Sequence, residues 1–169
     1  MNLSHFDKIY KIVVGYVEAK LDYNYNMVKT VVPKLIRHET SPKPYIFLSK
    51  DFFENKCLCI IIPDRGDISP GVFNKSSLFY ESLKKGSVFP YVDLALKENF
   101  SVLIMNPNYP KDTKNVNCNV DSFDHYAHCE CIWNEFITGK KFETVIIIAH
   151  QLASISLIKL VNKFSNNYN

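Results

Sequence analysis

The sequence carries little charge of either sign and no long apolar run. Charged residues make up 22% of its 169 residues, and 20 Lys and Arg against 17 Asp and Glu give a net charge of +3. This net charge is too small, and the basic residues are too scattered, to form a positively charged surface that attracts nucleic acid. We therefore expect no direct nucleic-acid binding. The longest apolar stretches, 58–63 and 145–149, fall far short of the roughly 20 residues that cross a bilayer, so no membrane span is expected.

The sequence also lacks the marks of a secreted protein. Its five Cys are odd in number, and their spacing is not that of a disulfide framework. The N-terminal segment has charged residues within its apolar pattern, namely Asp7, Lys8, Lys11 and Glu18, and so does not resemble a signal peptide. We therefore expect the protein to lie in a reducing compartment. No Walker loop, G-x-G-x-x-G motif or pair of catalytic carboxylates is present, and we predict no cofactor.

What the sequence does have is apolar residues, 47% of the total, and aromatic residues, 14%. This composition can close one sizeable core, so we expect a single domain over residues 1–169 that ends in a polar tail at 165–169. Apolar residues recur at helical spacing from Phe6 to Leu21, and Ser4 can cap the first turn. A first helix is therefore predicted over about 5–21.

Five short runs of β-branched, aromatic or continuously apolar residues predict strands. They lie at 27–32, 45–48, 57–62, 100–105 and 145–149. The first two are expected to start the sheet as an antiparallel pair. The last three are apolar on both faces, which is typical of central strands between two layers of helices.

The segments between and after these three strands have helical patterns. One helix is expected to begin with Ser87 as its cap and to turn Val88, Val92, Ala95 and Leu96 inward. Its length suits a crossover between parallel strands.

A second helix is expected to begin at Asp121 or Ser122, to bury Trp133 and to end at Gly139, and a last helix to cover 152–164. This order predicts an α/β fold, a three-layer sandwich resembling the N-terminal half of an α/β-hydrolase, with an antiparallel start and then a mainly parallel sheet. Ligands of such folds bind at the carboxyl ends of the strands, so the long loops there are the first candidates for a site. These loops are 63–77 and 106–122.

The turn after the last strand is where an α/β-hydrolase carries its nucleophile, in the motif G-x-S-x-G. The residues there are Ala149, His150, Gln151, Leu152 and Ala153. Gln151 stands at the apex, and an amide cannot attack a carbonyl. Ser154 lies further into the helix, where we expect its hydroxyl to bond back to the chain. We interpret this turn as a degenerate nucleophile elbow.

The loop after the third strand, which would complete an oxyanion hole, is degenerate as well. It consists of Pro63, Asp64, Arg65 and Gly66. Pro63 removes one amide donor, and Asp64 brings negative charge to the place where an oxyanion would form. The acid and histidine of a triad would follow strands beyond the five expected here, so we predict that the chain is not an enzyme.

Cysteine and histidine gather in one segment, which raises the question of a zinc site. The residues are Cys118, His125, His128, Cys129 and Cys131. Their spacing lacks the two separated ligand pairs of a finger or ribbon, so we predict no metal site, with Cys129 facing the core. Cys57 and Cys59 share one face of a buried strand and are expected to be core residues too.

Two further sets of charged residues have both a functional and a structural interpretation. His150 could be a general base, but the sequence indicates no carboxylate or nucleophile beside it, and we favour a histidine hydrogen-bonded within the turn. Asp64, Arg65 and Asp67 could form a ligand site. A solvated loop that holds its own ion pair is the favoured alternative.

Four strings of residues, taken in order, indicate a family. They are Tyr45 to Asp51, Val102 to Asn108, Ile132 to Ile137, and Val145 to His150. Together they resemble the Argonaute-binding-protein (Arb-type) domain family of cotranscriptional regulators, over about residues 10–163. Members commonly carry His-Gly-x-Gly after the third strand and Ala-His-Ser-x-Gly-Gly at the turn, of which Gly66, Ala149 and His150 are present here. The chain resembles a divergent member that is incomplete at its C-terminus.

This resemblance implies an α/β-hydrolase-like regulatory domain that acts through protein contacts in Argonaute-linked RNA silencing, heterochromatin or cotranscriptional regulation. Argonaute or chromatin factors are the implied partners, and the nucleus, the cytoplasm or both the implied location. The alternative is a residual hydrolase or small-ligand pocket, against which Gln151 argues. In the hydrolase strand order 143–149 would be a flat, β-branched edge without a further neighbour. We expect association through it, either between two copies of the chain or with a strand accepted from a partner, or else aggregation at high concentration.

Overall fold

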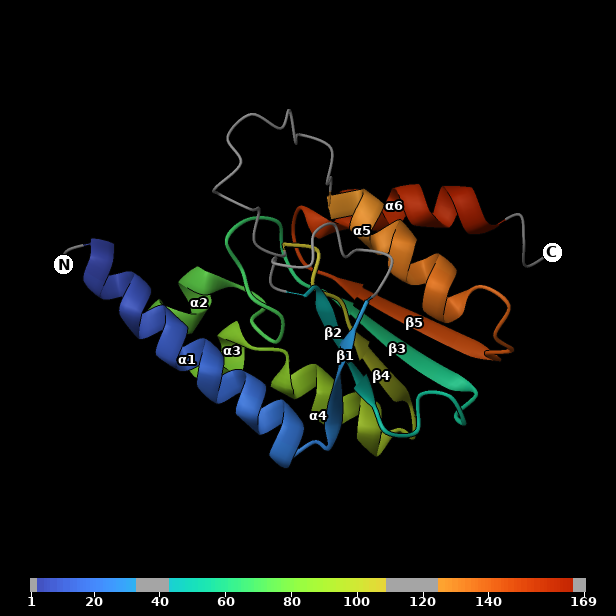
Figure 1. The fold of residues 1–169 in the computed structure, drawn as a ribbon, viewed down its shortest axis with the longest axis horizontal. Helices are drawn as coiled ribbons and strands as arrows, with labels where there is room; N and C mark the ends of the chain where they lie inside the picture. Colours follow the sequence, from blue (N-terminus) through green and yellow to red (C-terminus); the bar gives the residue numbers. More distant parts are fainter. Residues whose placement is uncertain (1–2, 33–42, 109–124, 166–169) are drawn as a thin grey trace.

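The computed structural model of the chain describes residues 3–32, 43–108 and 125–165 (Figure 1). Its centre is a five-stranded sheet. The strands are β1 (Met27–Val31), β2 (Tyr45–Ser49), β3 (Cys57–Ile62), β4 (Ser101–Ile104) and β5 (Thr144–Ala149). All five strands expected from the sequence are confirmed to within a residue at each end, because their runs are rich in the β-branched and aromatic residues that fit a pleated surface.

The strands are arranged in the order β1-β2-β4-β3-β5. β2 is antiparallel to both β1 and β4, whereas β3 is parallel to both β4 and β5. The antiparallel start is confirmed, and the sheet as a whole is mixed rather than mainly parallel. The carboxyl ends of β3, β4 and β5 therefore meet at one rim of the sheet.

Helices cover both faces of the sheet. They are α1 (Leu3–Tyr23), α2 (Lys75–Tyr80), α3 (Leu83–Gly86), α4 (Phe89–Lys97), α5 (His125–Ile132), the π-helical turn η2 (Trp133–Ile137) and α6 (Ala153–Phe164). Cys59 and Ile61 of β3 pack with α1 and α4, while Leu58 and Ile60 pack with α5, η2 and α6. A strand alternates its side chains between two faces, which is why β3 is apolar at every position. None of the described helices has the length and apolar character of a membrane crossing.

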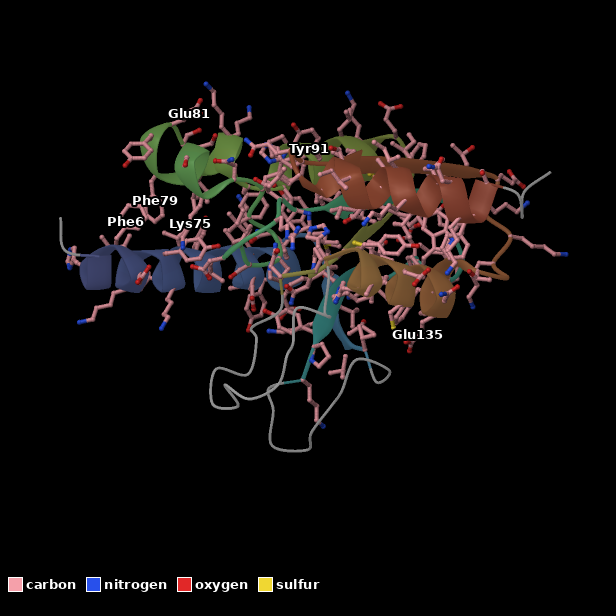
Figure 2. All side chains as sticks on the ribbon, turned by 90° about the horizontal axis from the view of Figure 1, so that it is seen from above. Phe6, Lys75, Phe79, Glu81, Tyr91 and Glu135 are labelled. Carbon is pink, nitrogen blue, oxygen red and sulfur yellow. The ribbon has the colours of Figure 1, made fainter. Side chains whose placement is uncertain are left out.

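α1 also holds the two short helices that follow β3. Phe6 of α1 and Phe79 of α2 lie against each other with their ring centroids 4.1 Å apart (Figure 2). The sequence predicted a loop over 63–77 and neither α2 nor α3. Their starts are nevertheless marked in the sequence, because Asn74 and Ser82 accept hydrogen bonds from backbone N–H groups three residues later.

The start of α4 differs from the prediction. Ser87 does not cap this helix, because it forms an antiparallel bridge with Val72. Val88, Val92 and Ala95 are buried as expected, but Leu96 is 37% exposed and does not face inward.

The helix before β5 buries Trp133 as expected, and Gly139 follows its end with a φ of +79°. The expected start of this helix at Asp121 or Ser122 lies outside the described residues. The structure adds a change of helix type that the sequence did not indicate, since the last turn is π-helical from Trp133.

β5 lies at the edge of the sheet. Among the described residues it pairs only with β3, and Ile146 is 45% exposed where Ile60 and Ile61 of β3 are fully buried. The apolar pattern at 145–149 was therefore wrong in indicating a central strand, whereas the edge strand expected at 143–149 from the hydrolase strand order is confirmed among the described residues. An apolar run does not distinguish a central strand from an edge strand when the neighbours come from distant parts of the chain.

Candidate functional site

The loop after β3 and the turn after β5 meet at the carboxyl rim of the sheet. Ile62 and Ala149 are partners in the parallel register, and the backbone N–H of His150 donates to the carbonyl of Ile62 at 3.2 Å. Both segments singled out in the sequence, Pro63 to Gly66 and Ala149 to Ala153, are thus brought side by side. Parallel strands produce this result because their ends share one edge.

Asp64 is the centre of this rim, and we call it with its contacts the Asp64 site. Its Oδ1 accepts a hydrogen bond from the backbone N–H of Arg65 at 2.8 Å and from that of Leu152 at 3.1 Å. Asp64 is only 7% exposed. Leu152 precedes the first residue of α6 and offers no capping side chain, so the carboxylate satisfies an amide at the positive end of that helix.

Asn108 completes the loop from the end of the neighbouring strand. Its Nδ2 donates to the carbonyl of Asp64 at 2.5 Å, and its Oδ1 accepts from the N–H of Gly66 at 2.9 Å. Asn108 was not among the site residues expected from the sequence. Its place three residues after Met105, the last residue of an apolar run, was the available signal, because polar groups at the carboxyl ends of parallel strands face the ligand side of the sheet.

The expectation of a solvated loop with its own ion pair was wrong. Asp64 is buried and bound to amides, and Asp67 pairs with Lys75 of α2 at 2.6 Å rather than with Arg65. Arg65 itself is exposed. The position of the Asp64 carboxylate depends on the N-terminal end of α6, which lies far away in the sequence. A local sequence pattern cannot indicate such a contact.

Gln151 forms the apex of the turn between β5 and α6. Its φ is +44°, in the left-handed region that L-residues with a side chain rarely adopt, and it is exposed. The hydroxyl of Ser154 donates to the carbonyl of Gln151 at 2.6 Å, which confirms that Ser154 bonds back to the chain. A sharp turn of this kind presents its apex side chain outward, and here that side chain is an amide.

His150 lies closer to a carboxylate than the sequence indicated. Its Nδ1 is 3.9 Å from Asp64 Oδ2, and this nitrogen has no hydrogen-bond partner among the described residues. The ring of Phe73 meets the imidazole at a centroid distance of 4.9 Å, and the ring of Tyr91 stacks on Phe73 at 4.9 Å. Nδ1 of the ring does not make the hydrogen bond expected within the turn; the backbone N–H of His150 bonds to β3, and its carbonyl accepts the N–H of Ala153 within the turn at 2.9 Å.

A second histidine lies behind the rim and was assigned no role from the sequence beyond the rejected zinc site. His125 Nδ1 lies 2.8 Å from Ser156 Oγ, and His125 Nε2 lies 3.2 Å from the carbonyl of Pro63. Since a carbonyl only accepts, Nε2 carries the proton and the Ser156 hydroxyl donates to Nδ1. Both side chains are buried, so this pair joins α5, α6 and the loop after β3.

Three of the other cysteine and histidine residues, Cys59, His128 and Cys129, are buried, whereas Cys57, also expected in the core, is only half-buried. Burial and the neighbouring His125 lower the pKa of His128 to about 3, and burial raises the pKa of the Cys59 thiol to about 11. Cys129 faces the core as expected. No group of three or more potential metal ligands occurs among the described residues, and Cys118 lies outside them.

Comparison with known proteins places the chain in a family. The family model of the Arb2 domain matches residues 1–122, which include the loop after β3 but not the turn after β5. No solved structure shows significant similarity to the chain.

Three curated relatives are named as cotranscriptional regulators. The chain is 31% identical over 111 residues to the "Cotranscriptional regulator ARB2A homolog" of Dictyostelium discoideum, a match that covers 64% of this chain and 28% of the relative. It is 28% identical over 108 residues to the human "Cotranscriptional regulator ARB2A", covering 63% and 26%, and 21% identical over 211 aligned positions to the chicken homolog, covering 95% and 50%. The chain thus spans between about a quarter and a half of the length of these relatives. With the family model matching well over half of its residues, the chain belongs to the Arb2 domain family.

Proposed function

We propose that this chain is a non-catalytic regulatory domain that works through protein contacts in cotranscriptional regulation. The observation that carries the proposal is the position of the Asp64 carboxylate. In nucleophile-elbow hydrolases the oxyanion hole consists of the N–H after the nucleophile and an N–H from the loop after the third strand. The corresponding groups here are the N–H groups of Leu152 and Arg65, and both donate to Asp64 Oδ1.

An internal carboxylate therefore occupies the place where a substrate oxyanion would be stabilised. A second negative charge there would be repelled rather than bound. Gln151, at the apex, supplies no nucleophile. These features support the interpretation of 63–66 as a degenerate oxyanion loop and of 149–153 as a degenerate elbow on an α/β-hydrolase-like fold.

The names of the relatives favour a role in regulation. Within that role we propose, from the family resemblance, a link to Argonaute-dependent RNA silencing or heterochromatin. The proposed partners are Argonaute or chromatin factors. The proposed location is the nucleus, with or without a cytoplasmic pool. Self-association through 143–149 is part of the same proposal, because a domain that acts by contacts needs a contact surface.

A residual hydrolase is the second candidate, and one observation favours it. The Ser156 hydroxyl donates to an imidazole that a backbone carbonyl orients, which is the arrangement of a base-activated nucleophile. Against it, Ser156 is only 4% exposed and the nearby amide of Leu152 is already bound to Asp64.

Fluorophosphonate labelling of the pure protein separates the two candidates. We expect no covalent adduct, and the variants Ser154→Ala and Ser156→Ala to behave as the wild type does. An adduct on any residue from 149 to 156, lost in one of these variants, would overturn the non-catalytic proposal. A pulldown from nuclear extract followed by mass spectrometry tests the partners, and recovery of neither Argonaute nor chromatin factors would contradict that part.

A further inference from the structure

An open apolar groove of about 300 Å³ runs along the free edge of β5, beside α6. Its apolar walls are formed by Trp133, Phe142, Val145, Ile147, Val161 and Phe164, and Glu143 and Ser165 also line it. Asp64 and the residues that contact it do not line this groove, so it is separate from the Asp64 site.

Trp133 gives the groove an unused polar group. Its ring stacks on that of Phe164 at a centroid distance of 5.5 Å, and it is only 7% exposed. Its Nε1 is buried and has no hydrogen-bond partner among the described residues. Buried indole N–H groups usually find an acceptor, so this side chain leaves one donor unsatisfied at the groove wall.

The backbone of β5 offers a second set of unused groups. The N–H groups of Thr144 and His150 point to β3, where they donate to Lys56 and Ile62. N–H groups alternate in direction along a strand, so those of Val145, Ile147 and Ala149 point away from β3. No described strand lies on that side of β5.

Apolar side chains beside this edge are exposed on both faces of the sheet. Ile146 is 45% exposed on the face opposite the groove. On α6, Val161 of the groove wall is 48% exposed, and Ile158, three residues earlier, is 60% exposed. An edge with apolar surface above and below is completed by a strand that is itself apolar on both faces.

We propose that a second copy of this chain docks here, with β5 of one copy antiparallel to β5 of the other. The occupant that the edge requires is an extended segment, apolar on both faces and rich in β-branched residues, and Thr144–Ala149 is such a segment. A second copy presents it already extended and unpaired. The inference rests on the proposed contact role of 143–149 and specifies its partner and geometry.

Symmetry fixes more of this geometry. A dimer in which two edge strands pair antiparallel has its two-fold axis perpendicular to the sheet, so the groove faces of both copies lie on the same side. Residues that oppose each other must then point to the same face, so odd-numbered residues pair with odd-numbered ones, as Val145 would with Ile147. The two grooves meet across the axis, and each closes the open side of the other.

The test compares the full chain with variants by size-exclusion light scattering over a range of concentrations. We expect the wild type to pass from monomer to dimer as concentration rises, and Ile146→Lys to raise the dissociation constant about tenfold or more, because two added lysines face each other across the axis. Ile12→Lys is the matched control, since Ile12 is a 72% exposed isoleucine on α1. This variant should dimerise as the wild type does.

Two more measurements keep the result interpretable. Val145→Pro removes only an N–H that points away from β3, so it should keep the circular dichroism spectrum of the wild type and abolish the dimer. Hydrogen exchange should slow at the amides of Val145, Ile147 and Ala149 as concentration rises. A wild type that stays monomeric, a dimer that survives both β5 variants, or equal loss of the dimer in Ile12→Lys would overturn the inference. None of these results would change the outcome of fluorophosphonate labelling.

Discussion

Asp64 Oδ1 accepts a hydrogen bond from the backbone N–H of Leu152, 88 positions later in the chain, at 3.1 Å. The same oxygen accepts the N–H of Arg65 at 2.8 Å. One carboxylate thereby ties the loop after β3 to the N-terminal end of α6. The contact closes the rim of the sheet, and under the proposed function it also occupies the two amides that would form an oxyanion hole.

Removing this carboxylate should destabilise the protein. We expect Asp64→Ala to lower the free energy of unfolding by about 1–3 kcal/mol, because the partly buried N–H groups of Leu152 and Arg65 lose their acceptor. Asp64→Asn keeps one acceptor oxygen and should cost less. Urea titration measures the loss, with Asp67→Ala as the control, since the Asp67 side chain is 89% exposed and its ion pair contributes little. Similar losses in Asp64→Ala and Asp67→Ala would contradict the role assigned to Asp64.

The conformation of Gln151 predicts an unusual stabilising substitution. Its φ of +44° is unfavourable for a residue with a Cβ, so Gln151→Gly should raise the free energy of unfolding by about 0.5–1 kcal/mol and Gln151→Val should lower it. Gly139→Ala is the complementary control. Gly139 has a φ of +79° and open space around an added Cβ, so only backbone strain, about 1 kcal/mol, should appear. Destabilisation by Gln151→Gly would show that the side chain of Gln151 makes a stabilising contact.

Trp133 is predicted to be a core anchor. It is 7% exposed and stacked on Phe164, so Trp133→Ala should lower the free energy of unfolding by about 3–5 kcal/mol. Tyr23→Ala, at an aromatic residue that is 81% exposed, should change it by less than about 0.5 kcal/mol. Denaturant unfolding followed by far-UV circular dichroism measures both. A loss below about 1 kcal/mol for Trp133→Ala would mean that the ring is accessible and serves as binding surface.

His128 predicts a loss of stability in acid. Burial lowers its pKa from 6.5 to about 3, so below pH 6.5 the unfolded chain binds a proton that the folded chain does not. The contribution of His128 is therefore complete above pH 6.5 and is lost as pH falls towards 3, at up to about 1.4 kcal/mol per pH unit. Urea titrations at several pH values should show a shallower acid slope for His128→Leu than for the wild type. Parallel slopes would show that His128 is not buried in its neutral form.

Local sequence patterns were enough to predict the strands, most of the helices and the residue at the apex of the turn. β-branched and aromatic runs gave all five strands, and helical spacing gave α1, α6 and the burial of Trp133. The presence of Gln151 where a nucleophile would stand, and the back-bonding of Ser154, also followed from residue type and position alone. These features depend on a few neighbouring residues, and local sequence reports such features directly.

Contacts between groups that are far apart in the sequence became apparent only in the folded chain. The sequence predicted Asp64 to be a solvated loop residue, but in the structure it accepts a hydrogen bond from an amide at the end of α6. Ser156 and His125 form a hydrogen-bonded pair that was not predicted, because they lie far apart in the sequence. The run 145–149 reads as a central strand, yet β5 has one neighbour among the described residues. Hydrogen-bond partners and strand order are set by packing between segments far apart in the chain, and an apolar or acidic residue carries the same local signal whichever neighbour it finally meets.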